Sequence, residues 1–270
     1  MINGSNPKMP ILMYHEISDA ISNGKNSFNK MTPLYNIPAA IFENQIRFLS
    51  SVGYKSLLPE EAQGLSGDGK YIIITFDDGL KGNYRYAFPI LRKYGFKATI
   101  FVAVDKIGAE DFMNWEELYR LLKEGISIQS HTMSHRPLQN LNNKEIYEEL
   151  YTSKRTIEEK LNTKVHAISL PHGSYNQKVI TIAQQAGYRF MFTSNMECVY
   201  FNSFHDDFTV LGRIAMTNKM KLDKLIKIIE YNKMELMPLI FAKTAKNAFK
   251  RMIGIENYRA LYRRFFKIKL

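Results

Sequence analysis

The feature that most constrains the fold is an alternation, between residues 70 and 200, of short β-rich runs with amphipathic stretches of about 10 to 18 residues. This alternation is typical of repeated βα units, in which helices connect parallel strands and cover the sheet. The predicted strands are Tyr71 to Phe76, Ala98 to Val104, Ile126 to Ser130, Val165 to Leu170 and Arg189 to Thr193. The predicted helices are Tyr84 to Tyr94, Trp115 to Lys123, Lys144 to Leu161 and Gln177 to Ala186.

Local signals support the helix ends. Asn114 and Glu117 form the pattern of a capping box at a helix start. Gly95, Gly125 and Gly187 stand where helices are expected to stop, because glycine tolerates the left-handed conformation that ends a helix.

The flanking segments extend the pattern. Residues 10–18 (PILMYHEIS) predict another strand, residues 18–38 an irregular loop, and Phe42, Ile46 and Leu49 the apolar stripe of a helix that ends near Gly53. Residues 208–216 (FTVLGRIAM) predict a last strand, followed by a helix from Lys219 to about Lys233.

The expected fold is therefore α/β, a distorted (β/α) barrel of about seven parallel strands followed by a basic helical tail. Pro238 marks the expected boundary between a domain at residues 1–238 and the tail at residues 239–270. In such barrels the chemistry lies at the carboxyl ends of the strands, so polar residues at those ends are the candidates for a site.

Composition restricts the kind of metal site and the partners. The single cysteine, Cys198, excludes an intrachain disulfide and a cysteine-based metal cluster, so a metal would need nitrogen and oxygen ligands. The net charge is +11, but residues 239–270 hold nine Lys/Arg and one Glu, which leaves the rest of the chain at +3. The basic character therefore belongs to the tail, and no nucleic-acid partner is expected.

The first candidate segment is TFDDG, in which an apolar strand runs directly into Asp77 and Asp78. Two adjacent carboxylates repel each other unless a cation or a shared proton compensates, so one could bind a metal while the other acts as a base. The alternative is a plain Asp-Asp-Gly turn.

The second candidate segment is SHTMSH, which supplies His131 and His135 at another predicted strand end. Their spacing brings both imidazoles to one side of a turn, and two histidines with one aspartate form a common three-ligand metal set. A pair of surface or capping histidines is the alternative. Because both segments end strands of one alternating pattern, we expect them to meet.

Two weaker candidates occupy similar positions. LPHGSYN contains Pro171, His172 and Gly173 in a tight turn that could aim backbone N–H groups into the site. His15 follows the apolar residues ILMY at a strand end and is a candidate acid, although a lone histidine beside apolar residues is more often structural. The nucleophile elbow, the phosphate-binding loop and the dinucleotide-binding glycine pattern are all missing from the sequence.

TFDDG and SHTMSH, about fifty residues apart and followed by LPHGSYN, resemble the polysaccharide deacetylases of carbohydrate esterase family 4, the NodB-homology domain. The resemblance extends from about Pro10 to Met216 and implies that Asp78, His131 and His135 bind the metal and that Asp77 is the general base. It also implies that the backbone N–H of His172 helps to hold the oxyanion and that Trp115 walls the acyl pocket, although Trp115 could equally be a core aromatic at a helix start.

Two departures from the family pattern point to a subgroup. Ser169 stands where many members have an arginine, and the late Leu-x-His motif that supplies their acid is absent. The sequence is similar instead to the circularly permuted group that resembles poly-N-acetylglucosamine deacetylases. That similarity implies that His15 is the acid and that Arg213 replaces the missing arginine as the partner of Asp77.

The resemblance implies metal-dependent removal of the N-acetyl group from an amino sugar in a glycan or a lipid-linked precursor. Zn²⁺ is the expected ion, with Co²⁺, Ni²⁺ and Fe²⁺ as alternatives. The alternatives to this function are deformylation of a lipid-linked amino sugar and an inactive relative that only binds glycans.

The tail at residues 239–270 interleaves basic and aromatic side chains, so it could lie on an anionic membrane surface or pack as an ordinary solvated helix. The sequence has neither the roughly 18 apolar residues of a membrane span nor the apolar run of a signal peptide. A cytoplasmic protein, with or without peripheral attachment to the membrane, is therefore the expectation.

Overall fold

The computed structural model describes residues 8–19, 33–63, 65, 69–173, 175–197, 199–204, 207–231, 234 and 237–238. The predicted tail at residues 239–270 and Cys198 lie outside these ranges. No helix in the described ranges is both long enough and apolar enough to cross a bilayer.

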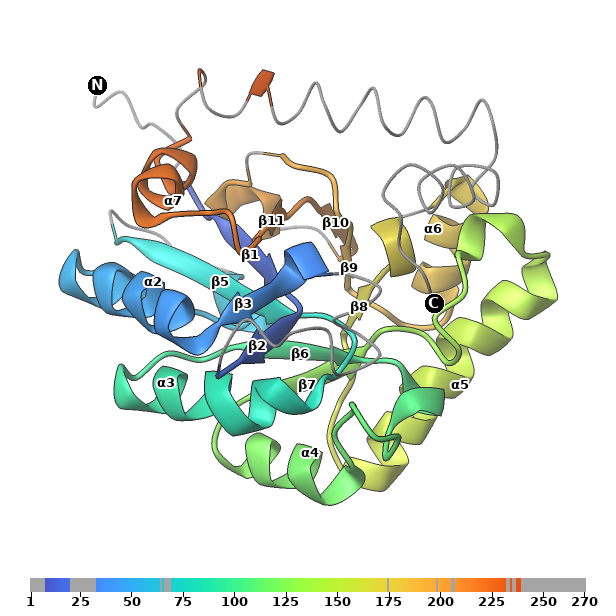
Figure 1. The fold of residues 1–270 in the computed structure, drawn as a ribbon. Coiled ribbons are helices and arrows are strands. Elements are labelled where there is room, and N and C mark those ends of the chain that lie inside the picture. Colours follow the sequence, from blue (N-terminus) through green and yellow to red (C-terminus); the bar gives the residue numbers. More distant parts are fainter. Residues whose placement is uncertain are drawn as a thin grey trace, which may run out of the picture.

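A curled parallel sheet forms the centre of the molecule, and helices surround it (Figure 1). Along the sheet the strands follow the order β10 (Thr209–Leu211), β9 (Phe190–Phe192), β8 (Ala167–Ser169), β7 (Ser127–Ser130), β6 (Thr99–Val102), β5 (Tyr71–Phe76), β1 (Ile11–Tyr14) and β11 (Ile214–Ala215). The short strand β4 (Lys55–Ser56) pairs with the start of β5. Every described pairing in this sheet is parallel, as the βα alternation predicts.

The two edges of the sheet are joined by only two residues, Gly212 and Arg213. Strand β10 pairs with β9 on one side, and β11 pairs with β1 on the other. The prediction of one strand over residues 208–216 is therefore wrong, because this segment must bend at Gly212 to serve both edges. Counted as one bent strand, it completes a distorted barrel of seven strands, which confirms the predicted fold class.

The amino-terminal segment departs from the sequence prediction. Residues 10–18 do not form one strand, because β1 ends at Tyr14 and β2 (Glu16–Ser18) leaves the barrel to pair with β3 (Asn36–Pro38). The predicted irregular loop at residues 18–38 therefore contains a strand and the 3₁₀ turn η1 (Pro33–Tyr35) in its described part. His15 lies at the point where the chain leaves the barrel.

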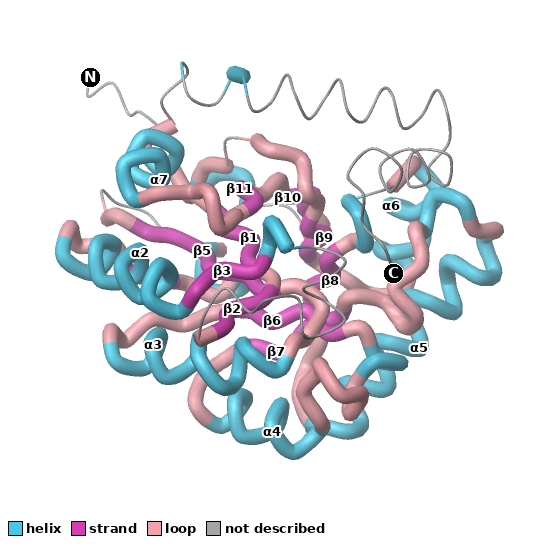
Figure 2. The backbone as a smooth tube through the Cα atoms, viewed as in Figure 1, coloured by secondary structure: helices cyan, strands magenta, loops and turns pink. Residues whose placement is uncertain are grey.

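The helices lie outside the strands, as Figure 2 shows in cyan, and most match their predicted positions. They are α2 (Ala39–Ser51), α3 (Phe88–Lys93), α4 (Trp115–Lys123), α5 (Asn143–Leu161), α6 (Gln177–Gln185) and α7 (Leu222–Ile229). The capping box of α4 is present, with Asn114 and Glu117 exchanging hydrogen bonds of 2.8 and 2.9 Å. Gly95, Gly125 and Gly187 adopt positive φ after their helices, as expected.

Two helix predictions are corrected. The stretch predicted as a helix from Tyr84 to Tyr94 begins with one wide π turn, η3 (Asn83–Ala87), before α3. The helix predicted from Lys219 to about Lys233 is shorter, because α7 spans only Leu222–Ile229. The remaining described helical turns are η2 (Pro59–Ala62), η4 (Val104–Lys106), η5 (Leu138–Asn140), η6 (Pro171–Gly173) and η7 (Phe201–Phe204).

Successive side chains of a strand point to opposite faces of the sheet, so the core has two parts, one between the sheet and the helices and one inside the barrel. In β5, Ile72 and Ile74 pack with the surrounding helices, whereas Ile73 packs inside the barrel with Phe101 and Phe190. Thr75 and Asp77 continue the inward positions at the carboxyl end of the strand. The barrel is therefore apolar at its amino end and becomes polar where the site is expected.

A prediction follows for the bend that closes the barrel. A Cβ at residue 212 would lie 2.6 Å from the Asn195 carbonyl oxygen and 2.7 Å from the Glu197 Cβ, so Gly212→Ala should lower the free energy of unfolding by about 1–3 kcal/mol. Gly95→Ala is the control, since Gly95 has positive φ but open space around its Cβ position. Urea denaturation would compare them, and a smaller loss for Gly212→Ala than for Gly95→Ala would contradict the prediction.

Candidate active site

A buried ion pair between Asp77 and Arg213 lies at the carboxyl end of the barrel interior. The guanidinium donates two parallel hydrogen bonds, from Nη1 to Oδ1 at 2.7 Å and from Nη2 to Oδ2 at 2.8 Å. Its Nε donates to the Thr193 carbonyl at 2.9 Å. Arg213 is 1% exposed and stacks near the rings of Phe101 and Phe192, so its orientation is fixed from several sides.

Ser169, at the end of β8, completes this pair. Its hydroxyl donates to Asp77 Oδ2 at 3.1 Å and accepts from Arg213 Nη2 at 2.8 Å. The family pattern often places an arginine at this position, and here the guanidinium reaches the same carboxylate from residue 213. The contact expected between Arg213 and Asp77 is therefore present in the structure.

The ion pair controls the protonation of Asp77. Burial raises the pKa of this carboxyl, but the Arg213 guanidinium and then His131 outweigh burial, so the pKa lies below its usual range. Asp77 is therefore ionised near neutral pH. Each of its oxygens keeps acceptor capacity beyond the bond from arginine, so Asp77 can accept a proton.

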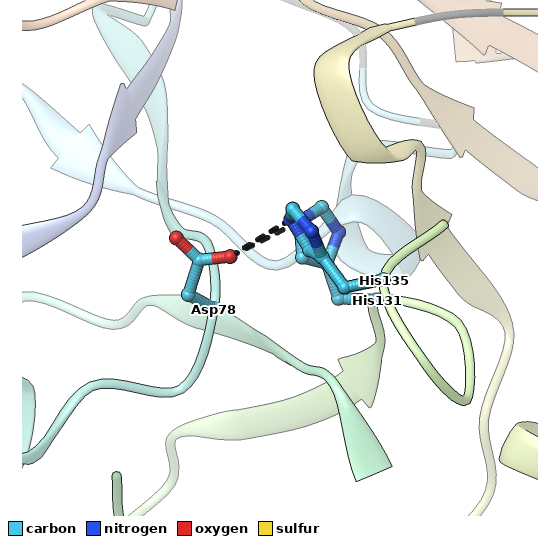
Figure 3. A group of neighbouring side chains, drawn as sticks. All are labelled: Asp78, His131 and His135. Carbon is cyan, nitrogen blue, oxygen red and sulfur yellow. Dashed lines mark ion pairs between the residues drawn. The ribbon is translucent and has the colours of Figure 1, made fainter. Parts of the chain in front are cut away.

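Asp78, His131 and His135 converge on one point, and Figure 3 shows both imidazoles facing the carboxylate. Asp78 Oδ1 lies 3.1 Å from His135 Nε2 and 3.6 Å from His131 Nε2, and one possible ligand atom from each residue lies within 4.8 Å of the others. Asp78 Oδ1 is buried and forms no hydrogen bond of regular geometry with the residues that the structure describes. A buried oxygen beside two imidazole nitrogens is the donor set that a divalent cation fits.

Left-handed backbone conformations turn these side chains inward. Asp78 has φ 73°, Thr132 has φ 69° and His135 has φ 62°. Residues with a Cβ adopt such angles at a cost, and clusters of them are typical of functional sites. The angle at Asp78 directs its carboxylate to the histidines, whereas the preceding Asp77 remains on the inward face of β5.

His131 is held in the form that binds a metal. Its Nδ1 lies 2.7 Å from the Ser169 carbonyl oxygen, which can only accept, so Nδ1 carries the proton and Nε2 presents its lone pair to the site. Burial lowers the pKa of His131 to about 4, so the ring is neutral at pH 7. Ser169 therefore contacts the base through its hydroxyl and a metal ligand through its carbonyl.

Glu149 of α5 supports the loop between the two histidines. Its carboxylate accepts from the backbone N–H groups of Met133 and Ser134 at 3.0 and 2.9 Å, and also from the Ser134 hydroxyl. Arg136 Nε lies 3.3 Å from the same carboxylate. Sequence reasoning missed this residue, although a glutamate on the buried stripe of a helix, beside Ile146 and Leu150, was a usable signal.

His15 lies close enough to lower the pKa of both Asp77 and Asp78. Its ring packs against Tyr35, with 4.7 Å between ring centroids. Its carbonyl accepts a 2.7 Å hydrogen bond from Asn83 Nδ2. The structure therefore brings His15 to the same end of the barrel as the two aspartates, as expected for an acid that works with them.

The turn η6 also lies at the site. His172 has φ 61°, and its ring centroid is 5.2 Å from that of His135. The Gly173 N–H donates to the Leu170 carbonyl at 2.8 Å and so serves the turn itself. A Cβ at Gly173 would collide with Ser194, which explains the glycine. The predicted role of this turn in holding an oxyanion stays a prediction.

Trp115 is the first residue of α4 and packs, half-buried, against the outer core. The Met113 N–H donates to the Gly79 carbonyl at 3.0 Å, so the segment before α4 runs beside the residue that follows Asp78. This placement agrees with either interpretation of Trp115, a wall of the pocket or a core aromatic.

Comparisons with known proteins find similarity to polysaccharide deacetylases in both sequence and fold. A family profile described as polysaccharide deacetylase matches residues 65–191. The chain is 35% identical over 187 residues to YxkH of Bacillus subtilis, whose name assigns it to the polysaccharide deacetylases, covering 67% of this chain and 63% of YxkH. It is 29% identical over 219 residues to a Staphylococcus aureus poly-beta-1,6-N-acetyl-D-glucosamine N-deacetylase, covering 71% of this chain and 74% of that protein.

Among solved structures, the Streptococcus pyogenes deacetylase PplD in complex with acetate superimposes with a TM-score of 0.74 and 26% identity. The match covers 83% of this chain and 99% of PplD. The barrel is therefore shared with a protein named as a deacetylase.

The ion pair predicts a pH-dependent stability. Because the folded-state pKa of Asp77 is below its unfolded value of about 3.9, the pair stabilises the fold fully above about pH 5 and loses its effect as pH falls. Arg213→Met, measured by urea denaturation with chelator present, should lower the free energy of unfolding by about 3–5 kcal/mol at pH 7 and by less below pH 4.

The double variant Arg213→Met with Asp77→Asn is the control, because it removes the buried charge together with its partner. It should lose less stability than the sum of the two single variants. A deficit for Arg213→Met that stays constant between pH 3 and pH 7 would contradict the assignment.

The two adjacent aspartates should differ in metal binding. Asp78→Asn removes a ligand and should weaken Zn²⁺ binding by more than about one hundredfold in calorimetric titration, since loss of an outer-shell contact alone typically weakens binding by 10 to 100-fold. Asp77→Asn is the matched control and should weaken binding much less, because Asp77 pairs with Arg213. Equal losses in the two variants would remove the proposed division of roles.

Proposed function

Because this chain belongs to the polysaccharide deacetylase family, we propose that it hydrolyses the N-acetyl group of an amino sugar in a glycan or a lipid-linked glycan precursor. One observation carries the proposal: an arginine-paired carboxylate, a three-residue metal set and His15 converge at one end of the barrel. A protein that only binds glycans has no need of a base, an acid and a metal set together.

The names of two relatives support the substrate class. The Staphylococcus aureus relative is named for removing N-acetyl groups from poly-β-1,6-N-acetylglucosamine. The Streptococcus pyogenes structure contains acetate, which is the acid that deacetylation releases. An N-acetylated amino-sugar polymer or its precursor is therefore the substrate class that we propose.

Asp78, His131 and His135 would hold one divalent cation, and their nitrogen and oxygen donors suit Zn²⁺. When bound, such an ion polarises the acyl oxygen and lowers the pKa of water from about 15.7 towards about 7. The neutral state of His131 and the ionised state of Asp78 are the protonation states that ligation requires.

Asp77 and His15 carry the proton transfers in the proposed mechanism. Asp77 accepts a proton from the attacking water, and Arg213 keeps the carboxylate ionised and oriented before the reaction. The water oxygen forms the new bond to the acyl carbon, and the bond from that carbon to the sugar nitrogen breaks. His15 gives its proton to the departing nitrogen, so the products are acetate and a free amine.

The turn Pro171–Gly173 and Trp115 are proposed to shape the acyl pocket. The His172 ring beside His135 places this turn on the same side as the metal set. A backbone N–H aimed at the acyl oxygen would stabilise the negative charge that develops there.

Acetate release from N-acetylglucosamine oligomers tests the proposal. Asp77→Asn and His15→Ala should each lower kcat by about 10²–10⁴, because each removes one proton transfer. His166→Gln is the control for His15, because His166 immediately precedes β8 and so lies at the opposite end of the barrel from the site. It should keep wild-type activity.

Other outcomes of this assay would overturn parts of the proposal. Release of formate instead of acetate would identify a deformylase. Full activity of Asp77→Asn, or of enzyme freed of metal by a chelator, would exclude the mechanism. No released acid from any N-acylated glycan would favour a glycan-binding relative.

A further inference from the structure

The segment that carries the base and the first metal ligand also holds the backbone around His15. The Tyr14 carbonyl accepts from the Asp77 N–H at 3.0 Å, and the His15 carbonyl accepts from Asn83 Nδ2 at 2.7 Å. The side-chain carboxyl group of Glu16 accepts a hydrogen bond from the backbone N–H of Gly82. Three consecutive residues are therefore fixed by one stretch that begins at Asp77 and ends at Asn83.

This attachment matters because His15 lies between two sheets. Strand β1 ends at Tyr14 in the barrel, and β2 begins at Glu16 in the separate sheet with β3. His15 is therefore outside both described strands, although the Asp77 N–H holds the Tyr14 carbonyl just before it. The hydrogen bond that Asn83 Nδ2 donates sets the position of the His15 carbonyl.

A buried asparagine at position 83 lowers the stability of the fold, unless the hydrogen bond that its side-chain N–H group donates is needed. The side chain is 1% exposed, and its amide oxygen is buried without a hydrogen-bond partner in the described part of the chain. An unsatisfied buried oxygen destabilises a fold, so an apolar residue would pack there more favourably. The hydrogen bond to His15 is the interaction that an apolar residue would lose.

Gly82 brings Asn83 close enough to reach His15. A Cβ at residue 82 would overlap the Glu16 carboxylate and the Ile17 carbonyl, so the two backbones approach at a distance that only glycine allows. The close approach of Gly82 to Glu16 and Ile17 lies one residue before Asn83, so it and the hydrogen bond from Asn83 to His15 hold the same two segments together.

We propose that Asn83 is a positioning residue that sets the place of the His15 imidazole relative to Asp77 and Asp78. The inference rests on the proposed function, in which His15 protonates the leaving amine. Asn83 acts through the His15 peptide, while the packing of the ring against Tyr35 sets its tilt. Loss of the bond should displace the acid and leave the base and the metal ligands in place.

Two substrates distinguish a displaced acid from general damage. An N-acetylglucosamine oligomer has an amine leaving group that needs a proton, whereas the leaving group of 4-nitrophenyl acetate departs without one. Asn83→Ala in the Zn²⁺-loaded protein of residues 1–270 should lower kcat on the oligomer by about ten- to one hundredfold with little change in KM. The rate on the aryl ester should change by less than about threefold, because it does not depend on the acid.

Three further variants make the test specific. Asn83→Leu fills the same space without a donor and should reproduce the pattern in a stably folded protein. His15→Ala combined with Asn83→Ala should be no worse than His15→Ala alone, because the two changes act on one proton transfer. Tyr188→Phe is the matched control, because it also removes a buried hydrogen bond from a side chain to a backbone carbonyl. The Tyr188 hydroxyl donates to the Leu150 carbonyl at 2.8 Å, and Tyr188 precedes β9, at the opposite end of the strands from the site.

Each outcome decides the proposal. An equal loss on both substrates, no loss on either, or a further loss of kcat when Asn83→Ala is added to His15→Ala would overturn the role of Asn83. A wild-type enzyme that releases no acetate from the oligomer would instead overturn the proposed function. Loss for the oligomer alone, shared by Asn83→Ala, Asn83→Leu and His15→Ala but not by Tyr188→Phe, supports the positioning role.

Discussion

The buried pair of Asp77 and Arg213 is the interaction on which both the barrel and its site depend. Arg213 belongs to the two-residue bend that joins the sheet edges, and Asp77 directly follows strand β5. Their two hydrogen bonds therefore connect the closure of the barrel with the end of the strand that carries the acidic motif. A buried guanidinium destabilises the fold unless it has an anionic partner, so Arg213 requires the Asp77 carboxylate. The same positive charge on Arg213 keeps Asp77, the proposed base, ionised.

Adjacent carboxylates take different roles because their backbones differ. Asp77 keeps the inward direction of β5, whereas Asp78 has a positive φ that turns it to His131 and His135. Ser169 contacts both halves of the site, through its hydroxyl on Asp77 and its carbonyl facing His131. The base and the metal set are therefore held in one hydrogen-bonded network, and a shift of β8 would move both.

Local patterns predicted much of this protein. Strand β5 and helix α4 have the bounds that alternation and capping indicated, and the metal set is the one that the two motifs indicated. The errors in the strands lie where a partner distant in the chain decides the structure. Residues 208–216 bend because they serve two edges, and residues 16–18 leave the barrel because β3 pairs with them. Glu149 and Asn83 were missed because their importance lies in what they contact, namely the histidine loop and the His15 carbonyl.

The sequence by itself determined the α/β class, the approximate number of strands, and which strand ends carry carboxylates and imidazoles, because these follow from periodicity and spacing within short windows. Apart from the pair of Arg213 and Asp77, which the family resemblance implied, only the tertiary structure decided which groups touch. Arg213 reaches Asp77 across 136 positions, Ser169 across 92, and Asn83 reaches the His15 carbonyl across 68. Contacts of that range depend on how the barrel closes, and closure depends on the packing of all its strands together.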